Sequence, residues 1–215
     1  MINKTDKTKA VINVFDNGAQ LYQDKFMNLD LYRDSLDLFC ENQKQKDAQI
    51  LDIACGPGNI TRFILSKNPD YKILGIDLSS KMIELAKTNN PSTRFEVMDC
   101  REISILTDKY DGIICGFGLP YLSKEEAIKL IKDVASLIKK GGLFYLSTME
   151  GNYADSGWRG PSSGEGPKVY MYYHQWDYLE SALQENGFEI IHLKRQEYPE
   201  NGDQDLIILA QRNIK

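Results

Sequence analysis

The sequence predicts an α/β fold: an open, mainly parallel β-sheet wound with helices on both faces. From residue 50 onward, short β-branched or apolar runs alternate with longer segments of helical period, which is typical of such sheets. The 215 residues are 42% hydrophobic and 27% charged, which is enough for one well-buried domain and too apolar for a disordered chain. We therefore expect a single domain.

Composition also limits the possible partners. The net charge of -5 gives no basic field for a phosphate backbone, so we expect no nucleic acid partner. The N-terminal residues 1–15 lack the apolar core of a secretory signal, and nowhere do about 18 apolar residues run together. We expect a cytoplasmic protein with no membrane partner. The four cysteines and two histidines form no ligand pattern, so we expect reduced thiols and no metal.

The first two segments are a helical, aromatic-rich cap at residues 1–45 and a core of alternating strands and helices at residues 46–150. The predicted strands of the core are residues 50–54, 71–77, 94–99, 110–116 and 142–149. The helices between them are expected to begin near Gly58, Ser79 and Ser123. Ser79 and Ser123 are candidate N-caps, and Glu126 forms a capping box with Ser123. Gly141 and Gly142 are expected to end the helix that Ser123 begins.

The pattern changes after residue 150. Residues 151–173 are rich in Gly, Ser and Pro and show no period, so we predict a long loop, either a lid or a disordered connector. Residues 174–215 hold an amphipathic helix stopped by Gly187 and two strands joined by "PENGD", a hairpin signal.

The turn after the first predicted strand has the features of a nucleotide site. It begins at Ala54, and Gly56 and Gly58 allow the backbone to approach a ligand beside a helix N-terminus. Asp77 ends the second strand, where a carboxylate can accept both hydroxyls of a ribose. Asp99 ends the third strand and is placed either near an adenine amino group or as a helix N-cap. Together these residues favour an adenosine-containing cofactor.

Asp52 and Thr61 distinguish two classes of such cofactors. A dinucleotide site normally has a third glycine where Thr61 stands. A carboxylate at Asp52 would repel a pyrophosphate, yet it attracts the ammonium group of a methionine moiety, directly or through water. We therefore expect a ligand that is cationic at that end.

Five segments resemble, in order and spacing, the motifs of class I S-adenosylmethionine-dependent methyltransferases of the small-molecule type. They are "ILDIACGPGN", "GIDLSSKMIELAK", "VMDC", "YDGIIC" and "LIKKGGLFYLST", within residues 50–148. The resemblance implies a Rossmann-like, doubly wound seven-stranded sheet of order 3-2-1-4-5-7-6 with the last strand antiparallel. It also implies S-adenosylmethionine as cofactor, S-adenosylhomocysteine as product and a small-molecule acceptor.

The resemblance assigns roles to individual residues. The residues implied to bind the cofactor are Tyr22, Asp52, Ala54, Gly56, Gly58, Asp77, Leu78, Met82, Asp99, Cys100 and Phe117. Asp52 would neighbour the amino group, and Phe117 would face the methionine part. Tyr22 would reach the cofactor carboxylate, with Tyr32 as the alternative. Met82 would pack on the adenine, with ordinary helix-core packing as the alternative.

The acceptor side carries weaker signals. Because a sulfonium methyl group is already electrophilic, positioning alone can supply about 7–11 kcal/mol, and a base is optional. His174 is the candidate base, with a capping or surface role as the alternative. Pro120 and Tyr121 resemble the end of the N-P-P-Y signature of amino-directed nucleic-acid methyltransferases, but the asparagine is absent and Leu119 precedes the proline, which argues against DNA or RNA. The candidate acceptor-pocket residues are Tyr121, Trp158, Tyr172 and Tyr173, with half-buried packing as the alternative.

Two other functions remain open at this point, a catalytically silent S-adenosylmethionine-binding or partner-binding module and a nicotinamide-dependent reductase. For the oligomeric state we expect a monomer or a homodimer.

Overall fold

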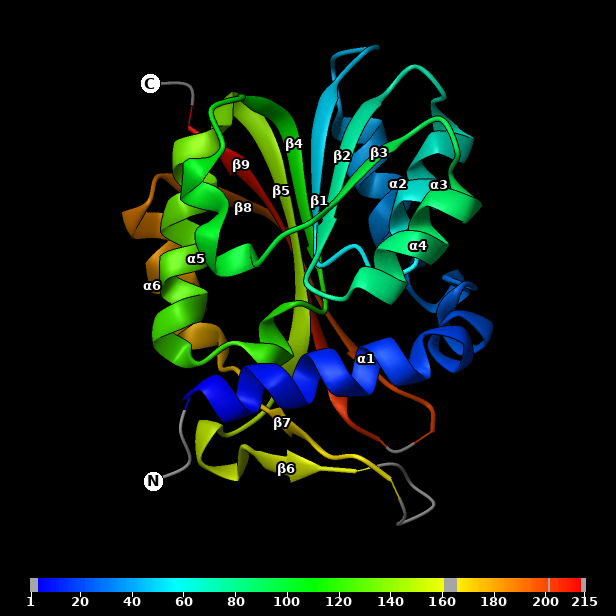
Figure 1. The fold of residues 1–215 in the computed structure, drawn as a ribbon. Helices are drawn as coiled ribbons and strands as arrows, with labels where there is room; N and C mark the ends of the chain where they lie inside the picture. Colours follow the sequence, from blue (N-terminus) through cyan, green and yellow to red (C-terminus); the bar gives the residue numbers. More distant parts are fainter. Residues whose placement is uncertain (1–3, 161–165, 201, 214–215) are drawn as a thin grey trace.

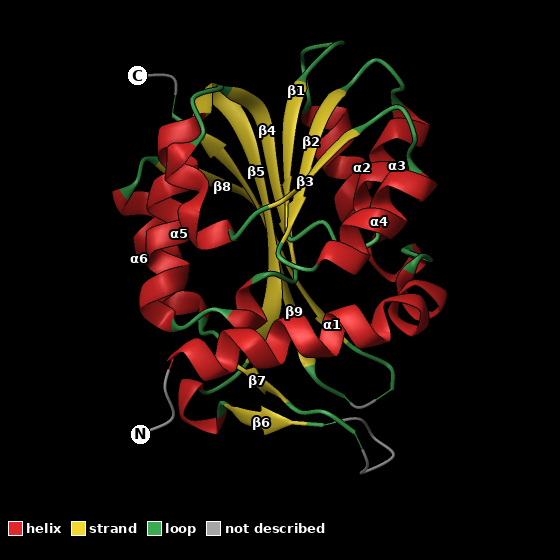
Figure 2. Ribbon diagram, viewed as in Figure 1, coloured by secondary structure: helices red, strands yellow, loops and turns green. Residues whose placement is uncertain are grey.

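A seven-stranded β-sheet lies at the centre of the computed structural model, with helices on both of its faces (Figure 1, Figure 2). The structure describes residues 4–160, 166–200 and 202–213. The strands are β1 (Gln49–Ile53), β2 (Lys72–Asp77), β3 (Arg94–Val97), β4 (Tyr110–Gly116), β5 (Ile138–Glu150), β6 (Gly157–Arg159), β7 (Val169–Met171), β8 (Phe188–Glu197) and β9 (Gln204–Arg212). The helices are α1 (Lys4–Phe26), α2 (Arg33–Asn42), α3 (Asn59–Lys67), α4 (Ser80–Asn89), α5 (Lys124–Leu137) and α6 (Trp176–Glu185). Four short 3-10 helices are η1 (Asp30–Tyr32), η2 (Cys100–Ile105), η3 (Leu119–Tyr121) and η4 (Tyr153–Asp155).

The strand order of the main sheet is β3-β2-β1-β4-β5-β9-β8. The strands from β3 to β5 pair in parallel, whereas β9 pairs antiparallel with both β5 and β8. Strands β6 and β7 form a separate two-stranded sheet. When these two are set aside, the order is the predicted 3-2-1-4-5-7-6 with an antiparallel last strand. The predicted fold class is therefore confirmed.

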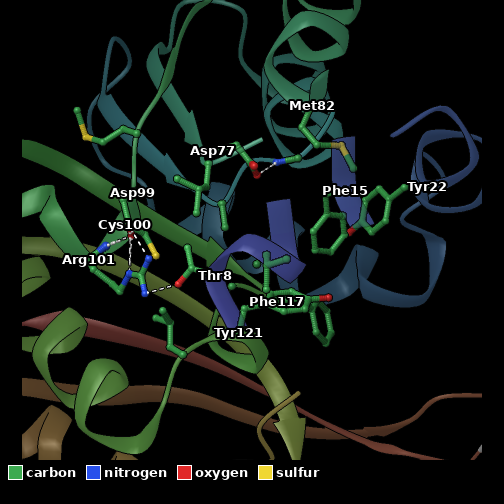
Figure 3. A pocket seen from close by; sticks show the side chains of 18 residues that line it. Thr8, Phe15, Tyr22, Asp77, Met82, Asp99, Cys100, Arg101, Phe117 and Tyr121 are labelled. Atoms are coloured by element: carbon green, nitrogen blue, oxygen red, sulfur yellow. Dashed lines mark hydrogen bonds and ion pairs between the residues drawn. The ribbon is translucent and has the colours of Figure 1, made fainter. Parts of the chain in front are cut away.

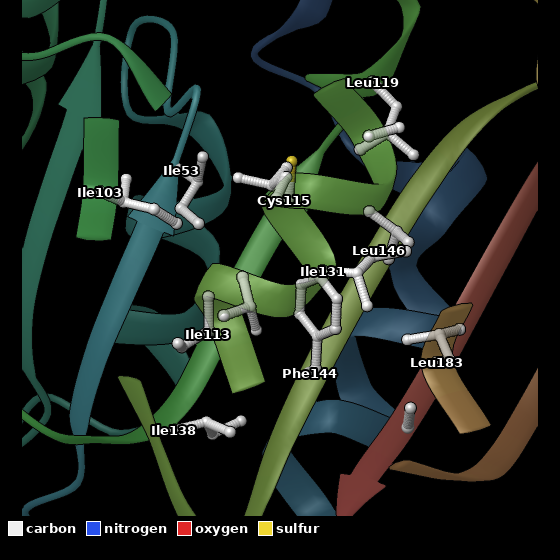
Figure 4. Close-up of a cluster of buried hydrophobic side chains, with 14 of the residues drawn as sticks. Ile53, Ile103, Ile113, Cys115, Leu119, Ile131, Ile138, Phe144, Leu146 and Leu183 are labelled. Atoms are coloured by element: carbon white, nitrogen blue, oxygen red, sulfur yellow. The ribbon is translucent and has the colours of Figure 1, made fainter. Parts of the chain in front are cut away.

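The sheet buries apolar side chains on both faces, as parallel sheets covered by helices do. Along β9, Ile208 belongs to the cluster that includes α5 and α6, and its neighbour Ile207 belongs to the cluster that includes α2 and α3. Figure 4 shows the first cluster, which contains Phe144 of β5, Ile131 of α5 and Leu183 of α6. Since this core immobilises the strands, it also fixes the turns that follow their carboxyl ends.

The predicted helix starts agree with the structure, and one predicted helix end is wrong. Ser79 caps α4 by accepting a hydrogen bond from the Met82 backbone N–H, and Ser123 and Glu126 form the expected capping box of α5. Helix α5 ends at Leu137, four residues before the glycine pair that was expected to end it. Gly141 and Gly142 lie inside β5, where the pairing with β4 shifts register. The glycine pair therefore marks an irregularity of the strand.

Helix α1 crosses the edge of the sheet where the parallel strands end, and the ribbon formed by β6 and β7 lies on its outer side (Figure 1). The segment 151–173, expected to be a loop, contains η4, β6 and β7; residues 161–165 lie outside the described part. Contacts among the described residues attach this segment to α1 and η3. The Lys7 ammonium lies 3.4 Å from the centre of the Tyr170 ring, and the Tyr172 backbone N–H donates to the Pro120 carbonyl at 2.7 Å.

Among the helices in the described ranges, none is both long and apolar enough to cross a membrane.

Candidate active site

A pocket lies between α1 and the turns that follow β1, β2, β3 and β4 (Figure 3). Its lining residues are Thr8, Val11, Phe15, Tyr22, Ala54, Gly56, Asp77, Leu78, Met82, Met98, Asp99, Cys100, Arg101, Gly116, Phe117, Gly118, Tyr121 and Leu122. These include every residue predicted to contact the cofactor except Asp52 and Gly58. The structure thus brings together side chains from four strand ends and from the N-terminal helix.

The centre of the pocket is built on Asp77 and the turn after β1. The Asp77 carboxylate accepts hydrogen bonds from the Gly56 and Ser79 backbone N–H groups, each at 2.9 Å. Burial raises the pKa of Asp77 above its usual value. The turn itself is in the left-handed region, with φ of +54° at Ala54 and +52° at Gly56. This conformation is sparsely populated for alanine and is held by the surrounding structure, as is common at ligand sites.

Asp99, Cys100 and Arg101 lie together at one end of the pocket (Figure 3). Asp99 caps η2 by accepting from the Arg101 backbone N–H, which was the predicted alternative role, and it also lines the pocket. The Arg101 guanidinium pairs with the Asp99 carboxylate and donates to the Thr8 hydroxyl at 3.0 Å. This ion pair therefore links the end of β3 to α1.

Four aromatic side chains form the opposite end (Figure 3). Phe15 of α1 lies edge-on to Tyr22 and to Tyr121, with ring centres 5.6 Å and 5.2 Å apart. Phe117 follows β4 and has a backbone φ of +54°. Its ring packs against the ring of Tyr32, with ring centres 5.2 Å apart. Burial raises the pKa of the Tyr22 hydroxyl to about 12 and raises that of Tyr121 as well, so both stay protonated at neutral pH.

Asp52 and Gly58 do not line the pocket. The Asp52 carboxylate is buried and accepts a hydrogen bond from the Thr61 hydroxyl at 2.6 Å, while its second oxygen has no partner among the described residues. Burial raises the pKa of Asp52 to about 7. Gly58 has a φ of +76°, and a Cβ there would lie 2.5 Å from the Asn90 side chain. Its glycine allows α3 to pack closely on α4.

His174 also lies away from the pocket, as do Trp158, Tyr172 and Tyr173. The imidazole is fully buried, and burial lowers its pKa to about 4, so the ring is neutral. Its Nε2 donates to the Leu119 carbonyl at 2.8 Å, and its Nδ1 accepts from the Tyr178 hydroxyl. Since both ring nitrogens are engaged, the arrangement fits a structural role that holds η3 in place rather than the general base considered from the sequence.

Sequence reasoning missed part of the lining. The missed residues are Thr8, Val11, Phe15, Met98, Arg101, Gly116, Gly118 and Leu122. A signal existed for the N-terminal ones, because Thr8, Val11, Phe15 and Tyr22 recur at helical spacing on one face of α1. That spacing predicts an amphipathic helix without saying what its face covers.

The residues of this pocket fit an adenosine-containing, sulfonium-bearing cofactor. A buried carboxylate stands at the end of β2, the thioether side chains of Met82 and Met98 are part of the lining, and aromatic rings lie at the end opposite Asp99 (Figure 3). Aromatic faces attract cations such as a sulfonium. Within the described residues, no group of His, Cys, Asp and Glu is arranged to hold a metal ion.

The comparisons with known proteins agree with this arrangement. The methyltransferase domain family matches residues 50–142. The chain is 32% identical over 124 residues to a protein of Invertebrate iridescent virus 6 that is named provisionally as methyltransferase 235L, covering 57% of this chain and 46% of that protein. It is 30% identical over 112 residues to the ubiquinone biosynthesis O-methyltransferase of Coxiella burnetii, covering 50% of this chain and 46% of that protein. The chain thus spans about half the length of the curated relatives it matches.

A solved structure shares the fold over nearly the whole chain. The magnesium protoporphyrin IX methyltransferase of Synechocystis, with bound S-adenosylhomocysteine, has a TM-score of 0.74 at 20% identity and covers 97% of this chain and 100% of that one. The matched family, the strand order and the residues at the strand ends all indicate the same class of protein. The core at residues 50–142 thus matches a methyltransferase domain family, and its strand order is the one expected from the resemblance to class I S-adenosylmethionine-dependent methyltransferases.

Proposed function

We propose that this protein transfers a methyl group from S-adenosylmethionine to a small-molecule acceptor. One observation carries the proposal: the Asp77 carboxylate at the end of β2 and the left-handed turn at Gly56 meet on the wall of one pocket, inside the family-matched core. In an open α/β sheet this is the place where nucleotide ligands bind. When bound, the cofactor supplies an electrophilic methyl group on a sulfonium.

The residues of the chain would hold the two ends of the cofactor differently. Asp77 would accept the ribose hydroxyls, and Leu78 and Met82 would pack against the adenine. The turn at Gly56 would pass beside the methionine part, with Tyr22 near its carboxylate. Asp52 is one step removed from the pocket wall, so its influence on the cofactor amino group would pass through water or through its charge.

Helix α1 would have to move for the cofactor to enter. The pocket leaves about 100 Å³ of free space, whereas sites for ligands of this class enclose roughly 300–1,000 Å³. We infer that α1 lifts to admit the cofactor and closes over it afterwards, which would exclude water from the transferring methyl group. The β6–β7 ribbon, attached to α1 at Lys7, would cover the acceptor side from outside.

The names of relatives support a small acceptor. The Coxiella burnetii relative is named for ubiquinone biosynthesis, and the Synechocystis structure for magnesium protoporphyrin IX. Neither name identifies the acceptor of this chain. A dedicated base is not required, because positioning a nucleophile against a sulfonium methyl supplies much of the rate.

The test is a product assay. The full chain is incubated with S-adenosylmethionine and a panel of small metabolites, and S-adenosylhomocysteine and the methylated product are measured by mass spectrometry. We expect stoichiometric formation of both with at least one acceptor, and a strong loss in Asp77→Asn. Failure of every acceptor, in protein that binds the cofactor, would leave a binding module instead of an enzyme.

A further inference from the structure

We infer that the methyl acceptor is a neutral, planar aromatic molecule, held at the aromatic end of the pocket by Phe15, Phe117 and Tyr121. The inference rests on the proposed methyl transfer and adds the chemical class of the acceptor to it. Three features of that end carry it: the orientation of the rings, the position of the charges and the state of the Tyr121 hydroxyl.

The rings at this end come from two parts of the fold that face each other across the pocket, α1 on one side and the segment after β4 on the other. Phe15 belongs to α1, whereas Phe117 follows β4 and Tyr121 belongs to η3. The Phe15 and Tyr121 rings meet edge-to-face, at an interplanar angle of 88° and a centre separation of 5.2 Å. This is the geometry that aromatic rings prefer with one another. A planar ring admitted when α1 lifts would replace the Phe15–Tyr121 contact by similar contacts to both.

Among the described lining residues, no cationic side chain lies at the aromatic end of the pocket (Figure 3). The charged side chains among the lining residues that the structure describes are Asp77, Asp99 and Arg101, from the β2 and β3 side (Figure 3). Asp77 accepts from two backbone N–H groups, and Asp99 is paired with Arg101. An anionic acceptor would therefore meet no cationic side chain at the aromatic end, and burying its charge there would be costly. A cationic acceptor would be repelled by the sulfonium itself.

The Tyr121 hydroxyl supplies polarity without charge. Tyr121 lines the pocket beside Phe15, and burial raises the pKa of its phenol. As a neutral phenol it can both donate and accept a hydrogen bond. It suits a hydroxyl or ring-nitrogen substituent on an otherwise apolar acceptor.

The experiment uses four probes of similar size in calorimetric titrations of the full chain saturated with S-adenosylhomocysteine. They are 2-naphthol, its saturated counterpart decahydro-2-naphthol, anionic 2-naphthoate and cationic 2-naphthylmethylammonium. We expect 2-naphthol to bind at least about tenfold more tightly than each of the others. Its edge-to-face ring contacts add to the burial of apolar area that decahydro-2-naphthol also provides, and it avoids the cost of burying the unpaired charge of the two ionic probes. Phe15→Leu and Tyr121→Leu retain apolar area without the ring, and each should reduce the preference over decahydro-2-naphthol.

Leu21→Ala is the matched control, because Leu21 belongs to the same helix α1 and is 75% exposed. It should leave all four affinities unchanged. If S-adenosylhomocysteine binds but 2-naphthol shows no preference, or no probe binds, the acceptor class is wrong while the proposed cofactor stands. A preference that persists in both leucine variants would overturn the assignment of Phe15 and Tyr121. Failure to bind S-adenosylhomocysteine would overturn the proposed function together with this inference.

Discussion

The floor and the roof of the pocket are built by different means. The floor consists of the turns after β1, β2, β3 and β4, which are continuous with strands buried on both faces of the sheet. The roof is α1, and the ties that hold it involve side chains. The Asp16 carboxylate accepts a hydrogen bond from the Ser79 hydroxyl at 2.5 Å, and the Gln23 side-chain oxygen accepts one from the Asn89 side-chain amide at 2.7 Å.

This difference separates two tasks. Strands inside a packed core open only with the whole domain, whereas an element held by a few peripheral contacts can open locally at a lower free energy. We infer that the floor determines which cofactor binds, and that the roof determines when it enters and leaves. Changes to the floor should therefore alter affinity, and changes to the roof should alter dynamics.

The largest effect is expected for Asp77→Ala on the floor. The change leaves the Gly56 and Ser79 N–H groups, as well as the ribose hydroxyls, without their acceptor. We expect a loss of about 1–3 kcal/mol in the binding of S-adenosylhomocysteine, measured by calorimetry on folded protein. Asp70→Ala is the matched control, since Asp70 is exposed and outside the pocket. Unchanged affinity in Asp77→Ala would make Asp77 a strand-end residue and nothing more.

The second effect concerns stability and the buried carboxyl of Asp52. Its pKa of about 7 in the folded state lies above its value of 3.8 in the unfolded state, so the folded protein retains the proton longer as pH rises. Stabilisation from this group is complete below pH 3.8 and is lost as pH rises toward 7, by at most about 1.4 kcal/mol per pH unit. Urea unfolding of the chain and of Asp52→Asn at pH 5 and pH 7.5 measures it. We expect the free energy of unfolding to fall less with pH in the variant, and parallel pH dependences would contradict the assignment.

A smaller effect is expected for the roof. Asp16→Ala removes the acceptor of the Ser79 hydroxyl and of the Lys81 backbone N–H. Local opening of α1 should become easier by about 0.5–1.5 kcal/mol, with little change in global stability. Hydrogen exchange followed by mass spectrometry should show faster exchange in α1 but not in β1 or β4. Asp24→Ala is the control, because Asp24 on the same helix bonds only to Gln20 among the described contacts. Equal acceleration in both variants would mean that Asp16 is not a tie.

The smallest effect on cofactor affinity is expected for Trp158→Ala in the outer ribbon. The Trp158 ring meets the Tyr170 ring edge-on, with ring centres 5.7 Å apart. The Lys7 ammonium of α1 lies over the same Tyr170 ring. We expect turnover to fall several-fold while binding of S-adenosylhomocysteine is unchanged, because lids act on the reacting complex. Tryptic cleavage at Arg159 and Lys168 should also slow when cofactor and acceptor are both present. A fully active variant, with cleavage indifferent to ligands, would identify the ribbon as a connector.

The same contrast explains what the sequence could predict. Floor residues such as Gly56, Asp77 and Asp99 stand directly beside predicted strands, and parallel strands bring their carboxyl ends to one edge, so local pattern was sufficient. The roof depends on the docking of a helix far away in sequence. The helical spacing of Phe15 and Tyr22 was visible, but the partner of that face was not.

Single side chains were harder to predict for a related reason. His174 has the ordinary chemistry of a base, and only the fold brings the Leu119 carbonyl and the Tyr178 hydroxyl to its two nitrogens. Gly141 resembled a helix stop, yet it accommodates the shift in pairing between β4 and β5. In each case a long-range contact determined the role of the residue.

We propose that the floor of the pocket holds an adenosine cofactor with a methionine tail. The most direct test of this proposal is a calorimetric titration of the full chain with S-adenosylhomocysteine and, in parallel, with NAD⁺. We expect S-adenosylhomocysteine to bind at one site per chain and NAD⁺ to give no binding heat, because Thr61 stands where a dinucleotide site has its third glycine. Equal binding of the two ligands, or binding of NAD⁺ alone, would contradict the account.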